Sequence, residues 1–125
     1  PQIAPGSLLL SRYLPDGFQL NNGSLHQGAL LLVGSHHFSQ SLSDINPLTL
    51  SFFKPLLDHG GIELIIFGAG KAMIPPQKML RQQLKERGIA LEIMETGAAC
   101  RTYNILTAEG RRVGAALVPV NIDLR

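Results

Sequence analysis

Short apolar runs separated by glycine and proline set the pattern of this chain. Residues 29–33 are continuously apolar and are bounded by glycines, and residues 62–67 are β-branched and almost wholly apolar. Runs of this length and composition favour strands that are covered on both faces of a sheet. The run at 89–94 and the closing run at 113–120 are predicted as two further strands.

Between these runs the apolar positions recur with a helical period. Residues 47–59 follow that period, and the helix is predicted to start near Phe53 or to be kinked at Pro55, because proline lacks an N–H and clashes with the preceding turn. A second helix is predicted over residues 75–88. It starts at the pair Pro75 and Pro76 and ends at Gly88. A third spans residues 97–110, with glycine at both ends.

The amino-terminal third is less regular. Residues 1–16 are interrupted by proline and glycine and form a poorly patterned segment. An Asn-Gly pair at 22–23 lies between two short runs and predicts a β-hairpin. Residues 36–46 are rich in serine, asparagine and glutamine and are predicted to form a loop, with room for a short strand near Phe38.

The order strand, helix, strand across residues 62–94 matches a parallel βαβ unit and places the chain in the α/β class. Its 125 residues are 45% hydrophobic and 16% charged, which excludes a disordered chain. We therefore expect a single domain over residues 1–125, with residues 1–16 as its irregular amino-terminal segment.

Charge, apolar run length and cysteine content indicate which partners and cellular locations are expected for the protein. Eleven basic and nine acidic residues give a net charge of +2, too small a surplus for the concentrated basic face of a nucleic-acid binder. A membrane helix requires about 18 consecutive apolar residues, and no run approaches that length. Residues 1–6 do not resemble a secretory signal, and the single cysteine fits a reducing compartment. The expected location is cytoplasmic, or mitochondrial where a leader has been removed.

The most specific motif is Ala-Ala-Cys-Arg-Thr-Tyr-Asn at 98–104, followed by Glu-Gly-Arg at 109–111 and set beside Gly-Ala-Gly at 68–70. With these residues the chain resembles the Mth-type domain-of-unknown-function family, which includes the mitochondrial respiratory complex I assembly factor 3. The resemblance covers about residues 18–118. It implies one α/β domain with a mixed sheet, a small additional β layer and flanking helices. It also implies a non-catalytic binding or assembly module with a protein partner. The family commonly has threonine where this chain has Ala69.

The candidate site lies where two parallel strands end. The turns after residues 62–67 and 89–94 should meet at one edge of the sheet, where open α/β folds bind ligands. Thr96 is predicted to cap the following helix, whose amino end and Arg101 would attract a small anionic ligand. The structural alternative is that the glycines only form tight turns and that Arg101 is solvated or pairs with a glutamate, Glu95 or Glu109. The predicted ligand or partner surface comprises Gly68, Ala69, Gly70, Thr96, Arg101, Tyr103, Asn104, Glu109 and Arg111.

Two inner rows are expected on the helix at 97–110, one of them formed by Ala98, Thr102 and Ile105. Arg101, Asn104 and Ala108 are then left on its outer side. Glu109 and Arg111 are predicted to pin the end of this helix. Cys100 lies in the first turn beside Arg101, and both features favour the thiolate. Cys100 is therefore the weak catalytic candidate of an alternative function. That alternative is a small-molecule enzyme with a pocket at Gly68–Gly70 and at the helix start at Gly97, which uses Cys100 and Arg101. In the other interpretation, Cys100 is a packing residue in the wall of the pocket.

Other chemistries are not favoured by the residues. The Gly-Ala-Gly turn lacks the third glycine of a dinucleotide fingerprint, and the sequence has no P-loop. The adjacent pair His36 and His37 would point to opposite faces of a strand, and no zinc-type spacing includes the cysteine. The basic helix at 75–88 is expected to be a solvated face. We expect no cofactor, no metal and no nucleic-acid partner.

Overall fold

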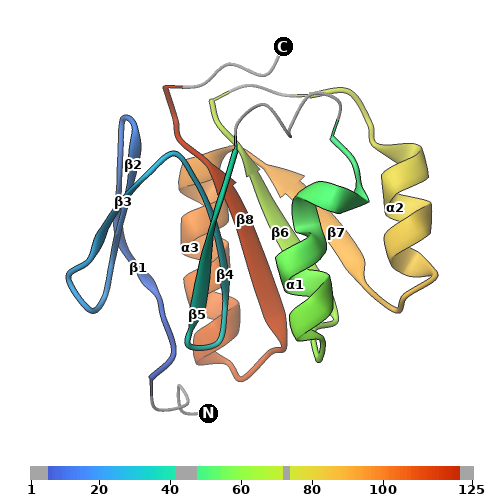
Figure 1. Ribbon diagram of the computed structural model, residues 1–125, viewed down its shortest axis with the longest axis horizontal. Helices are drawn as coiled ribbons and strands as arrows, with labels where there is room; N and C mark the ends of the chain where they lie inside the picture. The colour runs from blue at the N-terminus through green and yellow to red at the C-terminus, as the bar shows by residue number, and fades with distance from the viewer. Residues whose placement is uncertain (1–5, 42–47, 72–73, 122–125) are drawn as a thin grey trace.

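The computed structural model describes residues 6–41, 48–71 and 74–121 (Figure 1). Its centre is a mixed five-stranded sheet with the order β5-β4-β8-β6-β7. β6 pairs in parallel with both β7 and β8, whereas β4 is antiparallel to β8 and to β5. The strands are β4 (Ala29–Val33), β5 (His36–Gln40), β6 (Leu64–Ala69), β7 (Ala90–Met94) and β8 (Val113–Val118).

A second, smaller sheet forms an antiparallel meander of β1 (Leu10–Leu14), β2 (Gly17–Leu20) and β3 (Leu25–Gln27). The hairpin predicted at 22–23 joins β2 to β3 and is confirmed. The amino-terminal segment was predicted to be poorly patterned, but it contains the strand β1. Its residues become a strand through pairing with β2 and contacts with distant parts of the chain, which a local pattern does not reveal.

The helices α1 (Lys54–His59), α2 (Lys78–Lys85) and α3 (Thr96–Ala108) cover the large sheet. Figure 1 shows α1 and α2 on one face, with α3 and the small sheet on the other. Strand residues alternate between the two faces, so neighbouring side chains enter different cores. Leu31 and Phe67 pack with α1 and α2, whereas Leu30 and Ile66 pack with α3 and the small sheet.

Proline and glycine set the helix boundaries largely as predicted. Leu50–Phe53 forms a 3₁₀ turn, and α1 follows it with Pro55 in its first turn, where the missing N–H costs nothing. α2 begins at Lys78, just after the proline pair, and Gly88 has the positive φ of +77° that ends the helical path.

The edge strand β5 differs from the prediction. His36–Gln40 pairs with β4 over its full length, although a loop was predicted there with only a short strand. Polar residues can occupy an edge strand because one side of its backbone and part of each face contact water. The rest of that predicted loop, at 42–46, lies outside the described residues.

The βαβ prediction is confirmed by β6, α2 and β7. In the parallel register Gly68 lies opposite Met94, so the two strands end side by side. The turns that follow them therefore leave the same edge of the sheet. No helix among the described residues is both long enough and apolar enough to span a membrane.

Candidate functional site

Thr96, the first residue of α3, joins the ends of two strands. Its N–H donates to the Gly70 carbonyl oxygen at 2.8 Å, and its Oγ1 accepts from the Gly70 N–H at 2.8 Å. The same hydroxyl donates to the carbonyl oxygen of Val118 at the end of β8. Thr96 is fully buried, so all of these bonds are shielded from water. The predicted meeting of the two turns is therefore present, as a closed polar junction.

Close packing fills the inner side of this junction. A Cβ atom on Gly68 would lie 3.0 Å from the Ala99 Cβ and 3.1 Å from the Leu117 Cδ2. Ala69 and Gly70 are also buried, and Gly70 has a φ of +77° that favours glycine. The glycines allow backbones to approach each other, in keeping with the structural alternative. Gly68, Ala69 and Gly70 offer no exposed surface in this structure.

The amino end of α3 is already supplied with an anion. The Glu95 carboxylate accepts from the Ala98 N–H at 2.9 Å, so the cap is Glu95, and the prediction that Thr96 caps the helix is wrong. Thr96 lies one residue further on, where its hydroxyl faces the sheet. Arg101 pairs with the Glu95 carboxylate at 3.9 Å, and both side chains are exposed. The hydroxyl of Tyr13 lies over the same helix end. A Cβ atom on Gly97 would be only 2.9 Å from it.

Cys100 is a packing residue in this arrangement. Its side chain is only 4% exposed and belongs to the core between α3 and the sheet. Burial raises the pKa of the Cys100 thiol to about 12, and the nearby positive charge of Arg101 offsets only part of that rise. The prediction that its position favours the thiolate is therefore wrong, because desolvation of the charged form exceeds the effect of the neighbouring cation.

Tyr103 and Asn104 face the small sheet. Tyr103 is fully buried and its hydroxyl donates to the Leu8 carbonyl oxygen at 3.4 Å. The Asn104 amide satisfies both backbone groups of Leu10, accepting from its N–H at 3.0 Å and donating to its carbonyl oxygen at 2.8 Å. Asn104 had been predicted on the outer side of the helix. It turns inward because β1, which the sequence did not reveal, lies beside it.

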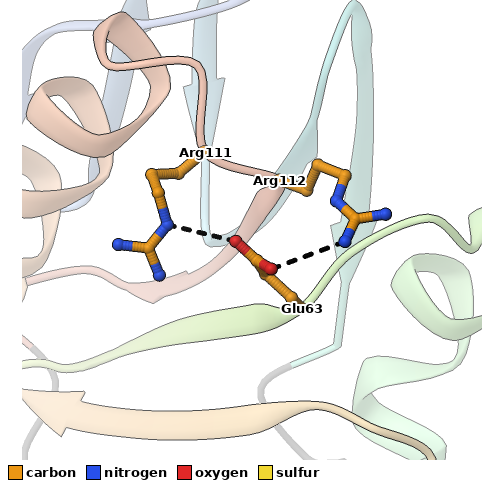
Figure 2. A network of polar contacts seen from close by, with 3 residues as sticks. All are labelled: Glu63, Arg111 and Arg112. Carbon is orange, nitrogen blue, oxygen red and sulfur yellow. Dashed lines mark hydrogen bonds and ion pairs between the residues drawn. The ribbon is translucent and has the colours of Figure 1, made fainter.

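Arg111 and Glu109 lie at the other end of α3. Figure 2 shows Glu63 between two arginines, with Arg111 Nε 3.1 Å from one carboxylate oxygen and Arg112 Nη2 3.5 Å from the other. The hydrogen bond from Arg111 is the main reason that the pKa of Glu63 is lowered. Glu63 just precedes β6, so Arg111 ties the chain after α3 to the start of this strand. Glu109 is exposed, and its backbone N–H donates to the Ile105 carbonyl oxygen at 3.0 Å.

The predicted surface is thus split between the two ends of α3, and several of its members are buried. The exposed side of the helix is formed instead by Arg101 and Ile105, one turn apart, with Tyr13 of β1 beside Gly97. We call Tyr13, Arg101 and Ile105 the α3 stripe. Tyr13 was not among the predicted site residues, because only the docked small sheet places it beside α3. Ile105 was assigned to an inner row of the helix, so its apolar character misled the prediction.

The histidines form two ring contacts on opposite sides of β5. The rings of His37 and His26 are 4.6 Å apart, and those of His36 and His59 are 5.2 Å apart. The adjacent pair therefore points to opposite faces, as predicted. Within residues 6–41, 48–71 and 74–121, no group of three or more metal-binding side chains is placed to hold an ion.

Comparison with known proteins identifies relatives over almost the whole chain. It is 33% identical to NADH dehydrogenase (ubiquinone) 1 alpha subcomplex assembly factor 3 of Danio rerio, over 94% of this chain and 67% of that protein. The human protein of the same name is also 33% identical, over 93% of this chain and 63% of its own length. The chain therefore spans about two thirds or less of the length of these animal relatives. An uncharacterized protein of Rhodobacter capsulatus is 34% identical, over 92% of this chain and 87% of that protein.

Solved structures share the fold. A crystal structure described as an outer membrane protein from Bartonella henselae superposes with a TM-score of 0.80 at 30% identity, covering 92% of this chain and 97% of that one. The solution structure of an Mth938-like domain from Bordetella pertussis gives 0.76 at 24% identity, covering 99% and 93%. The mixed α/β fold with its additional small sheet is thereby confirmed. The family model for proteins of unknown function DUF498/DUF598 matches residues 10–118, and the chain belongs to that family.

Proposed function

We propose that this chain is a non-catalytic protein-binding module that assists the assembly of a respiratory NADH dehydrogenase. The observation that carries this proposal is the 33% identity, over 93–94% of the chain, with two animal proteins named as NADH dehydrogenase assembly factors. The family model matches residues 10–118, from the first residue of β1 to the last residue of β8.

The α3 stripe is the proposed contact surface. Tyr13 is 42% exposed, Ile105 is 58% exposed, and the Arg101 side chain is 66% exposed. Arg101 and Ile105 are four residues apart and lie on one side of α3, and Tyr13 lies over the preceding turn. Tyrosine and arginine are enriched among the residues that contribute most to protein interfaces. The neighbouring Glu95 would let the stripe pair with charges of either sign.

The chemistry of the junction supports a non-catalytic role. Cys100 is buried with a raised pKa, and the Thr96 hydroxyl is fully used in hydrogen bonds within the chain. A small anion at the amino end of α3 would have to displace the Glu95 carboxylate from the Ala98 N–H. The exposed side chains of the stripe carry no such cost, and a protein partner can contact them directly.

Gene deletion and complementation in the organism that carries the gene test the proposal. Deletion of the gene should lower the amount of fully assembled NADH dehydrogenase on native gels, and the wild-type gene should restore it. The variants Arg101→Glu and Ile105→Asp should restore much less. Met79→Asp is the matched control, because Met79 is 76% exposed on α2, a different helix on the opposite face of the sheet.

The same experiment can refute the proposal. Each variant must first show wild-type thermal stability, so that lost assembly is not caused by unfolding. If deletion leaves the assembled enzyme unchanged, the proposed role is wrong. If deletion lowers assembly but both stripe variants restore it fully, the role stands and the α3 stripe is not the contact surface.

A further inference from the structure

The outer edge of β5 is open among the described strands. β5 is the last strand of the large sheet and pairs only with β4 in the part of the chain that the structure describes. Alternate residues of an edge strand direct their N–H and C=O groups away from the sheet, so this edge can accept another strand. The sequence His-His-Phe-Ser-Gln contains no lysine, acidic residue or proline, the residues that commonly block such pairing.

The other edges in the described structure are protected. At the far side of the large sheet, Glu92 is exposed on β7 and the Arg81 guanidinium donates to the carbonyl oxygen of Leu91. In the small sheet, the Asn104 amide covers the backbone of Leu10 on β1. β3 is only three residues long. Among the strands that the structure describes, β5 is thus the edge whose backbone is not blocked by a described side chain.

The sequence of β5 is complementary to itself in an antiparallel pair. A twofold axis at Phe38 would place Phe38 opposite its own copy, His37 opposite Ser39, and His36 opposite Gln40. An aromatic pair then lies at the centre, with polar pairs on both sides. Gln40 Nε2 already donates to the Phe52 carbonyl oxygen at 2.7 Å, so its Oε1 is the atom that can accept from His36 of the second copy. With neutral histidines no like charges meet. Such a contact is isologous, as in most homodimers.

The charges on α1 follow the same symmetry. α1 borders a hollow of about 640 Å³ along β5, lined by residues that include Phe38, Lys54 and Asp58. Lys54 and Asp58 are exposed and four residues apart in sequence. They form an ion pair in which Lys54 Nζ lies 2.7 Å from Asp58 Oδ2. In an antiparallel seam the twofold axis is perpendicular to the sheet, so α1 of each copy lies on the same face. A second copy presents these two charges in reverse order along the seam, so each α1 helix carries one positive and one negative charge toward its copy.

We propose that two copies of this chain pair through their β5 strands around a twofold axis at Phe38. The two large sheets then continue into one another, with the α1 helices side by side on one face. This contact lies on a different element from the α3 stripe and does not depend on the proposed function.

Sedimentation velocity at pH 8 with purified protein tests the pairing. This pH lies well above the ordinary pKa of a free histidine side chain, about 6.5. We expect the wild-type chain to sediment as a concentration-dependent dimer. Ser39→Lys puts a charge on the open edge and should raise the dimer dissociation constant at least about tenfold. Ser11→Lys is the matched control, because Ser11 is exposed on β1 and its substitution should leave the dimer intact.

The charges of α1 test the orientation. Asp58→Lys should weaken the dimer, because both α1 helices then carry only positive charge at residues 54 and 58 and repel each other. Exchanging both residues, Lys54→Asp with Asp58→Lys, should restore the wild-type dissociation constant to within about threefold. A wild-type chain that remains monomeric up to about 1 mM would overturn the proposal. A dimer that withstands Ser39→Lys but dissociates with Ile105→Asp would also overturn it, by placing the contact on α3.

Discussion

At the scale of single residues, Thr96 explains why the glycine turns of this chain lie where a ligand site was predicted. Its hydroxyl and N–H make three hydrogen bonds to Gly70 and Val118, in a place without access to water. Glycine at 70 allows the turn, and glycine at 68 allows α3 to approach the sheet. The same residues that would surround a small ligand in an open site are used here to close the edge of the sheet.

Substitution of Thr96 should therefore cost more than loss of a helix cap. Thr96→Val keeps the shape but leaves the Gly70 N–H and the Val118 carbonyl without their partner, which should lower the free energy of unfolding by roughly 3 kcal/mol. Thr96→Ser keeps the hydroxyl and should cost about 1 kcal/mol for the lost methyl group. Urea denaturation measures both values. Equal stabilities of the two variants would contradict the role given to the hydroxyl.

Cys100 should be nearly inert to alkylation in the folded protein. A pKa of about 12 in place of 9.0 lowers the thiolate fraction about a thousandfold, and burial also restricts access. We expect iodoacetamide at pH 7.5 to modify the native chain at least about a hundredfold more slowly than free cysteine. The urea-unfolded chain, in which Cys100 is exposed, should react at the ordinary rate. Fast modification of the native chain would favour the enzyme alternative.

At the scale of elements, one side-chain amide pairs α3 with the edge of the small sheet. The Asn104 side chain pairs with Leu10 as a neighbouring strand would. Its amide accepts a hydrogen bond from the Leu10 N–H and donates one to the Leu10 carbonyl oxygen, as a peptide unit does. Tyr103 and Cys100 fill the core beneath it. The small sheet thus attaches through polar contacts at its edge and apolar contacts beneath.

Asn104→Asp should loosen this attachment. Aspartate retains the acceptor for the Leu10 N–H but places a negative oxygen against the Leu10 carbonyl, which leaves that carbonyl unpaired. Hydrogen exchange at the β1 amides should become faster, while the amides of β6 and β8 keep their protection. Gln82→Glu, the same chemical change on the exposed face of α2, should have no such effect. Unchanged exchange at β1 would show that Asn104 does not hold the small sheet.

Local patterns in the sequence predicted much of this fold, and nonlocal contacts explain the rest. β4 and β6 are continuous apolar runs, and glycine and proline mark the ends of α2, so neighbouring residues were sufficient to predict them. β1 and β5 carry mixed residues and are strands because of their partners. The turns of the candidate site were correctly brought together. Its closure was not predicted, because the sequence does not show that Glu95 caps α3 or that Thr96 turns toward β8.

At the scale of the whole molecule, the two faces of the large sheet are covered differently. α1 and α2 cover one face, and α3 with the small sheet covers the other (Figure 1). The α3 stripe lies on the outer side of the second layer, and β5 lies at the rim between the two layers. A partner on the stripe and a second copy on β5 would therefore use separate surfaces. The two proposed contacts can therefore be occupied at the same time.

The most direct test of the central claim is site-specific photocrosslinking in the cell that encodes the chain. A benzophenone side chain would replace Ile105 on the stripe or, as the control, Met79 on α2. We expect position 105 to crosslink to a subunit of NADH dehydrogenase identified by mass spectrometry, and position 79 to give no such product. Crosslinking of that subunit from position 79, with none from position 105, would contradict the α3 stripe as the contact surface.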